Sequence, residues 1–201
     1  MGMMKSPIHH LQTTETFLRP LYNQVMVRKV EVVPYRTEWT LQFELEATLL
    51  RRIFGKQLVA VYHFGSTAIP GISAKPIIDI LLTVRDIACA DRLALRLKKL
   101  GYVAVGEYGI TGRRFFYKGT EDLRTHHLHV YAYDNPHVLR HIAFRDYLRS
   151  HPIPARRYAQ LKEQLASQFP EDMEGYVQGK NEFVREQEQE ALTWWQEENK
   201  S

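Results

Sequence analysis

Two continuous apolar runs stand out in the first half of the chain, at residues 58–64 and 77–84. Runs of this length without polar alternation are typical of strands that are buried on both faces of a sheet. Further segments rich in β-branched and aromatic residues predict strands at residues 25–33, 102–105, 113–118 and 126–133. The pattern therefore predicts a sheet in which two strands are covered on both faces.

Apolar residues at helical spacing predict five helices. The first covers residues 38–54, after the capping residue Thr37 and before Gly55. The side chains expected to face the core from this helix are Leu41, Leu45, Leu49 and Ile53, with Trp39, Phe43 and Leu50 widening the face. The other helices are expected at residues 86–100, 135–149, 154–169 and 171–195, bounded by proline, glycine or capping residues.

The order of these elements indicates the fold class. After the first strand it is helix–strand–strand–helix–strand–strand–strand, followed by three helices, which predicts an α/β (α+β) protein with a mixed sheet and a C-terminal helical cap. Residues 1–24 show no clear period and are expected to form an N-terminal arm. We expect residues 25–135 to form the α/β core and residues 136–201 to form a helical region packed on it.

The net charge of +4 is unevenly distributed. Residues 171–201 carry nine acidic and three basic side chains, a charge of −6, so the rest of the chain carries +10. A basic body favours anionic partners such as nucleotides or nucleic acid, although a solvated basic surface explains a spread-out excess equally well. The acidic last helix argues against a wrapped duplex, so nucleic acid is the less favoured partner.

Cysteine use and hydropathy exclude several other classes. The single cysteine, Cys89, rules out a disulfide framework and zinc sites built on several cysteines. No apolar run approaches the roughly 18 residues of a membrane span, and the start of the chain lacks the apolar core of a signal peptide. We therefore expect a cytoplasmic protein without a membrane partner. The pattern leaves the oligomeric state open.

The loop between the two apolar runs carries the first candidate chemistry. Gly65-Ser66 follows the first run, and such a turn opens backbone N–H groups toward a bound anion. Asp79 begins the second run, where a buried carboxylate is costly unless it meets a metal or a cation. Lys75 precedes Pro76, which keeps it extended toward the mouth of the loop. A phosphate cradle beside a metal-binding carboxylate is the minimum for phosphoryl or nucleotidyl transfer.

Two C-terminal helices each place a lysine on or beside an apolar stripe. Lys162 follows Tyr158 by one turn, and Lys180 follows Tyr176 by one turn. A lysine that points toward the core must be paired or line a site. We expect these two cations to face an anionic ligand. The alternative is that each lysine extends its ammonium group into solvent.

Two neighbouring strands add imidazoles and guanidinium groups. His127 and His129 share one strand face, because side chains alternate along a strand. Two such imidazoles form a partial metal site, and they are equally suited to bind phosphate or to move protons. Arg113 and Arg114 point to opposite faces of the other strand, so one of them is placed to bind phosphate and we expect this role for Arg114. The alternative is two solvated arginines.

Several of these segments resemble a known family. Gly65-Ser66 followed by Asp79 is similar to the signature of the nucleotidyltransferase superfamily of the DNA-polymerase-β type. Segments that more closely resemble the GrpB family of predicted nucleotidyltransferases, in the family's order, are Pro34–Trp39, Phe64–Gly71, Lys75–Ile80, Arg114–Gly119, His126–Val130, Phe144–Arg149 and Tyr176–Lys180. The resemblance implies a nucleotidyltransferase-like mixed β-sheet flanked by helices. In some family members such a domain is fused to dephospho-CoA kinase, which hints at nucleotide or cofactor metabolism.

The chain departs from the superfamily in its acidic residues. Active members use three carboxylates, two of them two residues apart on one strand. The positions two residues before and after Asp79 are Ile77 and Leu81, and the third acidic position falls on the strand of His127 and His129. Mg²⁺ prefers oxygen ligands, whereas one aspartate with one or two histidines suits Mn²⁺ or Zn²⁺ better. We expect a divalent metal at Asp79, His127 and His129, with its identity open among Mg, Mn and Zn.

The leading hypothesis is a metal-dependent nucleotidyltransferase that acts on a nucleotide or a phosphorylated small molecule. Asp79 and Ser66 are its candidate catalytic residues. The residues expected to bind phosphate are Gly65, Ser66, Lys75, Arg114, Lys162 and Lys180. Because the second carboxylate is missing, the alternative is a catalytically degenerate nucleotide-binding module or sensor.

Overall fold

The computed structural model describes residues 29–200. The arm predicted at residues 1–24, and the first part of the strand predicted at residues 25–33, lie outside this range. Within the described range no helix is long and apolar enough to cross a membrane.

Five strands form one mixed sheet in the order β1-β2-β5-β4-β3. Their bounds are β1 Leu58–Phe64, β2 Ile78–Val84, β3 Tyr102–Gly106, β4 Arg113–Gly119 and β5 Arg124–Ala132. β2 and β5 are parallel neighbours, and the other pairs are antiparallel. β2 is buried at every position except Asp79, which explains its continuous apolar run. The mixed α/β fold predicted from the pattern is confirmed.

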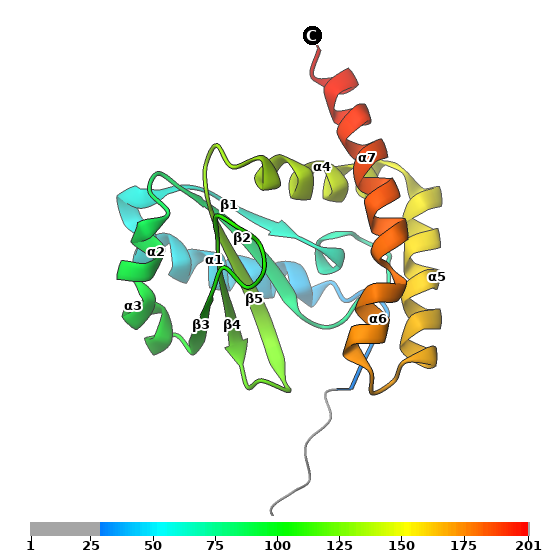
Figure 1. The fold of residues 1–201 in the computed structure, drawn as a ribbon, viewed down its shortest axis with the longest axis horizontal. Helices are drawn as coiled ribbons and strands as arrows, with labels where there is room; N and C mark the ends of the chain where they lie inside the picture. Colours follow the sequence, from blue (N-terminus) through cyan, green and yellow to red (C-terminus); the bar gives the residue numbers. More distant parts are fainter. Residues whose placement is uncertain (1–28, 201) are drawn as a thin grey trace, which may run out of the picture.

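One face of the sheet is covered by α1 (Glu38–Phe54), α2 (Ala88–Arg92) and α3 (Ala94–Lys99), with α1 behind the strands in Figure 1. A short 3₁₀ helix at Gly55–Gln57 connects α1 to β1. The main hydrophobic core lies between these helices and the sheet. Its sheet residues include the alternate positions Ile78, Ile80, Leu82, Val84, Phe116, Leu128 and Val130.

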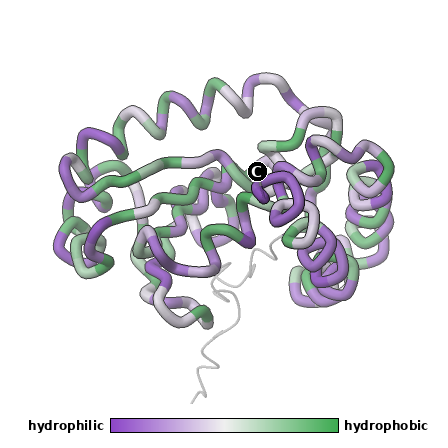
Figure 2. The backbone as a smooth tube through the Cα atoms, turned by 90° about the horizontal axis from the view of Figure 1, so that it is seen from above, coloured by the Kyte–Doolittle hydropathy of each residue, from purple (hydrophilic) through white to green (hydrophobic). Residues whose placement is uncertain are grey.

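Four helices make up the C-terminal region: α4 (Pro136–Ser150), α5 (Pro152–Gln168), α6 (Met173–Gly179) and α7 (Asn181–Glu198). Asn135 caps α4 by accepting a hydrogen bond from the His137 backbone N–H, with Pro136 in the first turn. α4 packs along α7, while α5 and α6 stand at one end of the sheet (Figures 1 and 2). Ile69 and Ile72 of the β1–β2 connection join the apolar cluster of α4 and α5.

The core face of α1 is only partly the predicted one, because Trp39, Phe43 and Leu50 are buried as expected but the leucine stripe is not. Leu41 and Leu45 are each 62% exposed and Leu49 is 37% exposed. The residues that α1 buries are Trp39, Phe43, Glu46, Ala47, Leu50 and Phe54. Glu46 is buried because its carboxylate accepts hydrogen bonds from Lys118 Nζ at 2.8 and 3.0 Å. Because Glu46 interrupts the buried row, the exposed leucine stripe is the more regular apolar pattern in the sequence, and this explains the incorrect prediction.

Other predicted elements are divided or have different bounds. Residues 29–33 form no strand, and Val33 makes only an isolated antiparallel bridge to Ala74. The helix predicted at residues 86–100 is split into α2 and α3 at Leu93, and the helix predicted at residues 154–169 begins at Pro152. The helix predicted at residues 171–195 is split into α6 and α7 at Lys180. This last break places Lys180 at a corner between two helices.

We expect Leu50→Ala to lower the free energy of unfolding by about 2–5 kcal/mol, because Leu50 is fully buried and its removal leaves a cavity. Leu45→Ala is the matched control on the same helix, and in dilute protein it should change this free energy by less than about 0.5 kcal/mol. Urea unfolding followed by circular dichroism measures both variants. Equal losses would contradict the assignment of the core face of α1.

Candidate functional site

A cavity of about 800 Å³ lies between the sheet face that carries Asp79 and the C-terminal helices. Two of its lining side chains are acids, Asp79 and Glu188. Seven are bases: Lys75, Arg113, Arg124, Arg140, Lys162, Lys180 and Arg185. Such an excess of positive charge within partly enclosed walls favours an anionic ligand.

The turn after β1 lies directly against Asp79. Phe64, the last residue of β1, pairs with Asp79 in the β1–β2 ladder. Gly65 then turns with a φ of 68°, and a Cβ atom at this position would overlap Asp79 Oδ2. Glycine is therefore required here both for the backbone conformation and for the close approach of the carboxylate. The structure thus brings together the Gly-Ser turn and the aspartate that the spacing singled out.

Thr67, rather than Ser66, fixes this turn to the sheet. The Thr67 hydroxyl donates to the Ile77 carbonyl at 3.3 Å and lies 3.0 Å from His63 Nε2. Burial lowers the pKa of His63 to about 4, so the ring is neutral at pH 7 and its Nε2–H donates to Thr67. Ser66 lines the cavity in the short 3₁₀ helix Ser66–Ala68.

Asp79, His127 and His129 meet on one face of the sheet. Asp79 pairs with His127 in the parallel β2–β5 ladder, and His129 lies two residues further along the same strand. His127 Nδ1 lies 3.0 Å from Asp79 Oδ1, and one ligand atom from each of the three residues lies within 4.8 Å of the others. The structure therefore brings together all three predicted metal ligands.

The protonation states of this group suit a metal ion. Burial acts to raise the pKa of Asp79, but the hydrogen bond with His127 holds this pKa below its usual value. Burial lowers the pKa of His129 well below its usual value. Near pH 7 the carboxylate is consequently ionised and the His129 ring is neutral, which are the forms that bind metals.

The donor atoms also fit a metal. His127 Nε2 is buried and has no hydrogen-bond partner among residues 29–200. The contact from Arg113 Nη1 to His129 Nδ1 is long for a hydrogen bond, at 3.4 Å. Two imidazoles and one carboxylate form a donor set that transition metals accept more readily than Mg²⁺ does.

Arg113, and not Arg114, reaches the cavity. Arg114 lies on the face covered by α2, where its Nε donates to both carboxylate oxygens of Asp91 at 2.9 Å. Arg113 is buried on the cavity face and donates to the Glu107 and Tyr108 carbonyls. The prediction that Arg114 joins the phosphate-binding group therefore does not agree with its position, because alternation along β4 turns it to the opposite face.

The three predicted lysines lie around two tyrosine rings. Lys162 is only 2% exposed, donates to the Ser73 carbonyl and lies 4.5 Å from the centre of the Tyr158 ring. Lys180, at the corner between α6 and α7, lies 5.9 Å from the centre of the Tyr176 ring. Lys75 approaches the same Tyr176 ring at 5.2 Å. The expected cluster of cations is therefore present at this end of the cavity.

Burial and mutual repulsion perturb these groups. Burial, together with the charge of Lys180, lowers the pKa of Lys162 to about 7. Burial likewise lowers the pKa of Lys180. Burial raises the pKa of Tyr158 to about 12, although a hydrogen bond with Ser66 acts in the opposite direction. The two phenols remain protonated near pH 7. An anion that enters the cavity would stabilise the charged form of both lysines.

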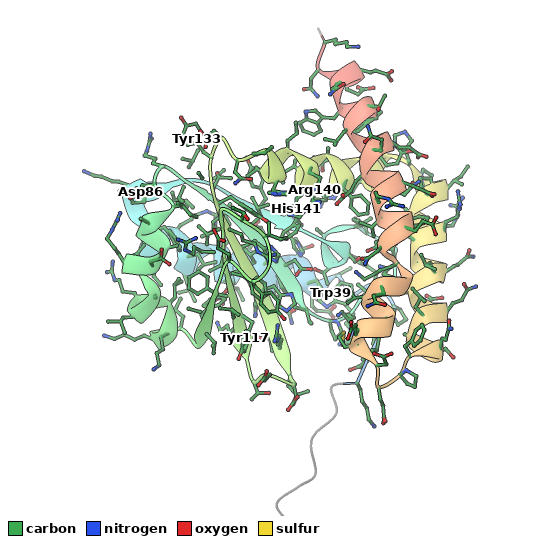
Figure 3. The ribbon with its side chains drawn as sticks, in the orientation of Figure 1. Trp39, Asp86, Tyr117, Tyr133, Arg140 and His141 are labelled. Carbon is green, nitrogen blue, oxygen red and sulfur yellow. The ribbon has the colours of Figure 1, made fainter. Side chains whose placement is uncertain are left out.

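Sequence reasoning missed the opposite wall of the cavity. Arg140 of α4 donates to Glu188 of α7 at 3.3 Å, and Figure 3 shows Arg140 beside His141 on α4. Arg124 of β5 also lines the cavity. Helical spacing offered one signal, because Arg140 is one turn before Phe144 and Glu188 is one turn after Val184. All four of these residues line the cavity.

Tyr108 is the other residue that the pattern did not single out. It adopts a φ of 47°, is 56% exposed and stacks on Phe115 with ring centres 5.0 Å apart. Its loop contains Gly106, Gly109 and Gly112, whose spacing predicts only a flexible or tightly turned connection. The loop places an aromatic ring at the edge of the cavity, next to the strand that carries Arg113.

Comparison with known proteins identifies several relatives of this chain. It is 42% identical over 184 residues to the UPF0157 protein YqkA of Bacillus subtilis, an alignment that covers 92% of this chain and 53% of YqkA. The chain thus spans about half the length of that relative. It is 28% identical over 195 residues to a dephospho-CoA kinase of Mycolicibacterium paratuberculosis, covering 85% of this chain and 48% of the kinase.

Two further comparisons cover most of this chain and most of the protein with which it is aligned. The chain is 40% identical over 162 residues to the glutamate-rich protein GrpB of Alkalihalophilus pseudofirmus, covering 79% of this chain and 93% of that protein. The crystal structure of the conserved protein GrpB from Enterococcus faecalis matches with a TM-score of 0.79 at 42% identity, covering 82% of this chain and 99% of that one. The GrpB protein family model matches residues 29–190. The chain therefore belongs to the GrpB family.

Proposed function

We propose that the cavity binds a divalent metal together with a nucleotide or another phosphorylated small molecule, and that the protein is a metal-dependent nucleotidyltransferase. One observation carries this proposal: Asp79, His127 and His129 present their ligand atoms to one another at the wall of a cavity lined by seven lysines and arginines. A metal supplies positive charge to a phosphate oxygen. The surrounding cations neutralise the rest of the ligand's charge.

The arrangement around the metal ligands supports this assignment. Asp79 acts on His127 through the Nδ1 contact of 3.0 Å, so the carboxylate orients the ring while the unpartnered Nε2 remains as a donor. Phe115 and Phe64 pack against His129 with ring centres 5.0 and 4.9 Å away. These contacts hold the His129 ring in place and limit the access of water to it.

The lysine end of the cavity supports a phosphorylated ligand. Lys162 and Lys180 are buried near each other, and their mutual repulsion contributes to the low pKa of Lys162. Asp79 and Lys180 both line the cavity, and the charge of Asp79 acts to raise the pKa of Lys180 against the effect of burial. A phosphate group between them would relieve the repulsion and satisfy the ammonium donors, whereas a neutral ligand would not.

A second function is a nucleotide sensor without turnover. It is favoured by one observation, that Ile77 and Leu81 occupy the positions two residues on either side of Asp79. With Asp79 as the one carboxylate among the three candidate metal ligands, the site offers fewer oxygen ligands than a two-metal mechanism uses. The dephospho-CoA kinase relative does not decide between the two functions, because the alignment covers less than half of that protein.

We expect the purified chain to bind about one Mn²⁺ or Zn²⁺ per molecule through these residues. Asp79→Asn and His129→Gln should each weaken metal binding by at least about 10–100-fold, the loss typical of even an outer-shell change, because the first removes the negative charge of the carboxylate and the second removes the imidazole. His126→Gln is the matched control, since His126 lies on the same strand with its side chain on the opposite face. Calorimetric titration, with metal content measured after dialysis, tests this. If the wild type binds no metal, or if all three variants behave alike, the metal site is excluded.

We expect ATP to bind in the presence of the metal, and Lys180→Gln to weaken this binding by about tenfold or more, because hydrogen bonds to charged groups contribute about 1.5–3 kcal/mol. Arg114→Gln is the control, because Arg114 pairs with Asp91 away from the cavity. Fluorescence titration with a labelled nucleotide measures both. Pyrophosphate release from nucleoside triphosphates then separates the two functions: metal-dependent release supports the transferase, and tight binding without release supports the sensor.

The affinity for ATP should fall as the pH rises above about 7, by up to about tenfold per pH unit. Without ligand Lys162 loses its proton there, so binding an anion must include protonation of Lys162. Burial also lowers the pKa of Lys180, so this lysine strengthens the same trend, whereas the charge of Glu163 raises the pKa of Lys162 and opposes it. ATP is already fully ionised above about pH 7.5, since the last phosphate pKa is near 6. Lys162→Arg keeps its charge and should flatten the profile. Equal slopes for wild type and variant would contradict the role of Lys162.

A further inference from the structure

The side of α1 that faces away from the sheet carries a stripe of exposed leucines. Leu41, Leu45 and Leu49 recur every fourth residue, so they lie in one row along the helix. Their exposed fractions are 62%, 62% and 37%. Single exposed leucines are normal, whereas an aligned apolar row on one helix is typical of a contact surface. This row is on the opposite side of the sheet from the cavity, so ligand binding does not account for it.

We infer that this leucine row binds the same row of a second copy of the chain, across a two-fold axis at Leu45. The residues around Leu45 are arranged symmetrically along the helix. Leu41 and Leu49 lie four residues on either side, and Glu38 and Arg52 lie seven residues on either side. At 100° per residue, all five positions fall within about 40° of the Leu45 direction, so they form one surface.

A two-fold axis makes this surface self-complementary. When two copies of α1 lie antiparallel, Leu41 of one copy faces Leu49 of the other, and Leu45 faces Leu45. The same rotation brings Glu38 of each copy to Arg52 of the other copy, so both ends carry opposite charges. Both side chains are exposed and available for this contact. Parallel helices would instead place Glu38 against Glu38 and Arg52 against Arg52, which like-charge repulsion disfavours.

The flanking residues are compatible with close approach of the helices. Gln42 and Thr48 border the row and would face each other across the axis without introducing a charge. Glu44 and Arg51 lie further round the helix and form an ion pair within the chain at 3.7 Å. The inner residues of α1 stay in the core, so association requires no change of fold.

The contact is small, because it uses one face of one helix. Interfaces below about 1,200 Å² are generally weak, so we expect a dissociation constant in the micromolar range. Sedimentation equilibrium of the full chain, from about 1 µM to about 500 µM, should show monomer passing into dimer. Leu45→Glu should raise the dissociation constant at least about 30-fold, because it places two charges at the centre of the contact. Leu95→Glu is the control, since Leu95 is 76% exposed on α3.

A charge exchange tests the two-fold geometry. Glu38→Arg and Arg52→Glu should each weaken the dimer, and the double variant should restore it, because the exchanged charges face each other again. Leu45→Cys should form a disulfide between two copies on mild oxidation, whereas Leu95→Cys should not. The native Cys89 is buried. A wild-type chain that remains monomeric at about 500 µM overturns the inference, as does a dimer that Leu45→Glu leaves intact.

Discussion

The parallel pairing of β2 with β5 is the constraint on which the candidate site depends. Its register sets Asp79 against His127 and leaves His129 two residues further along, on the same face. A slip of one residue would turn both imidazoles toward the α1 side of the sheet. The register is held by the other face, where Ile80 and Leu128 are paired and fully buried in the main core. The apolar core thus determines the geometry of polar residues that it does not contact.

The cavity concentrates the unfavourable electrostatics of the molecule. Lys162 is buried without an acidic partner in the salt bridges of residues 29–200, and burial lowers the pKa of the cavity-lining His129 well below its usual value. Burying these groups costs stability, which the apolar core on the other side of the sheet must offset. By contrast, the buried Glu46 of that core is fully paired with Lys118. Unbalanced charge confined to one cavity is typical of a binding site rather than of a structural network.

Local pattern predicted the sheet and the central candidate residues because both follow from short-range rules. Continuous apolar runs marked β1 and β2, and strand alternation placed His127 and His129 together. Alternation also required that only one of Arg113 and Arg114 reach the cavity, but it did not determine which of the two does. That choice depends on which face of β4 meets α2, a tertiary fact set by packing. The break at Lys180 had a local signal in Gly179 and Asn181, which are poor helix formers, but the apolar period from Tyr176 to Val184 continues across it and favours one helix.

The error on α1 has a more general physical cause. A helix period identifies apolar rows but carries no information about which row faces the core. On α1 two apolar rows exist, and the inner one is interrupted by Glu46, which is stable there only because Lys118 reaches it from β4. The outer row is the more regular, with leucines at 41, 45 and 49 and opposite charges at its two ends. Folding of one chain needs only the inner row. The regularity of the outer row is therefore better explained by a contact between molecules than by the stability of one molecule. A regular apolar row that remains exposed in the folded chain indicates an interface rather than part of the core.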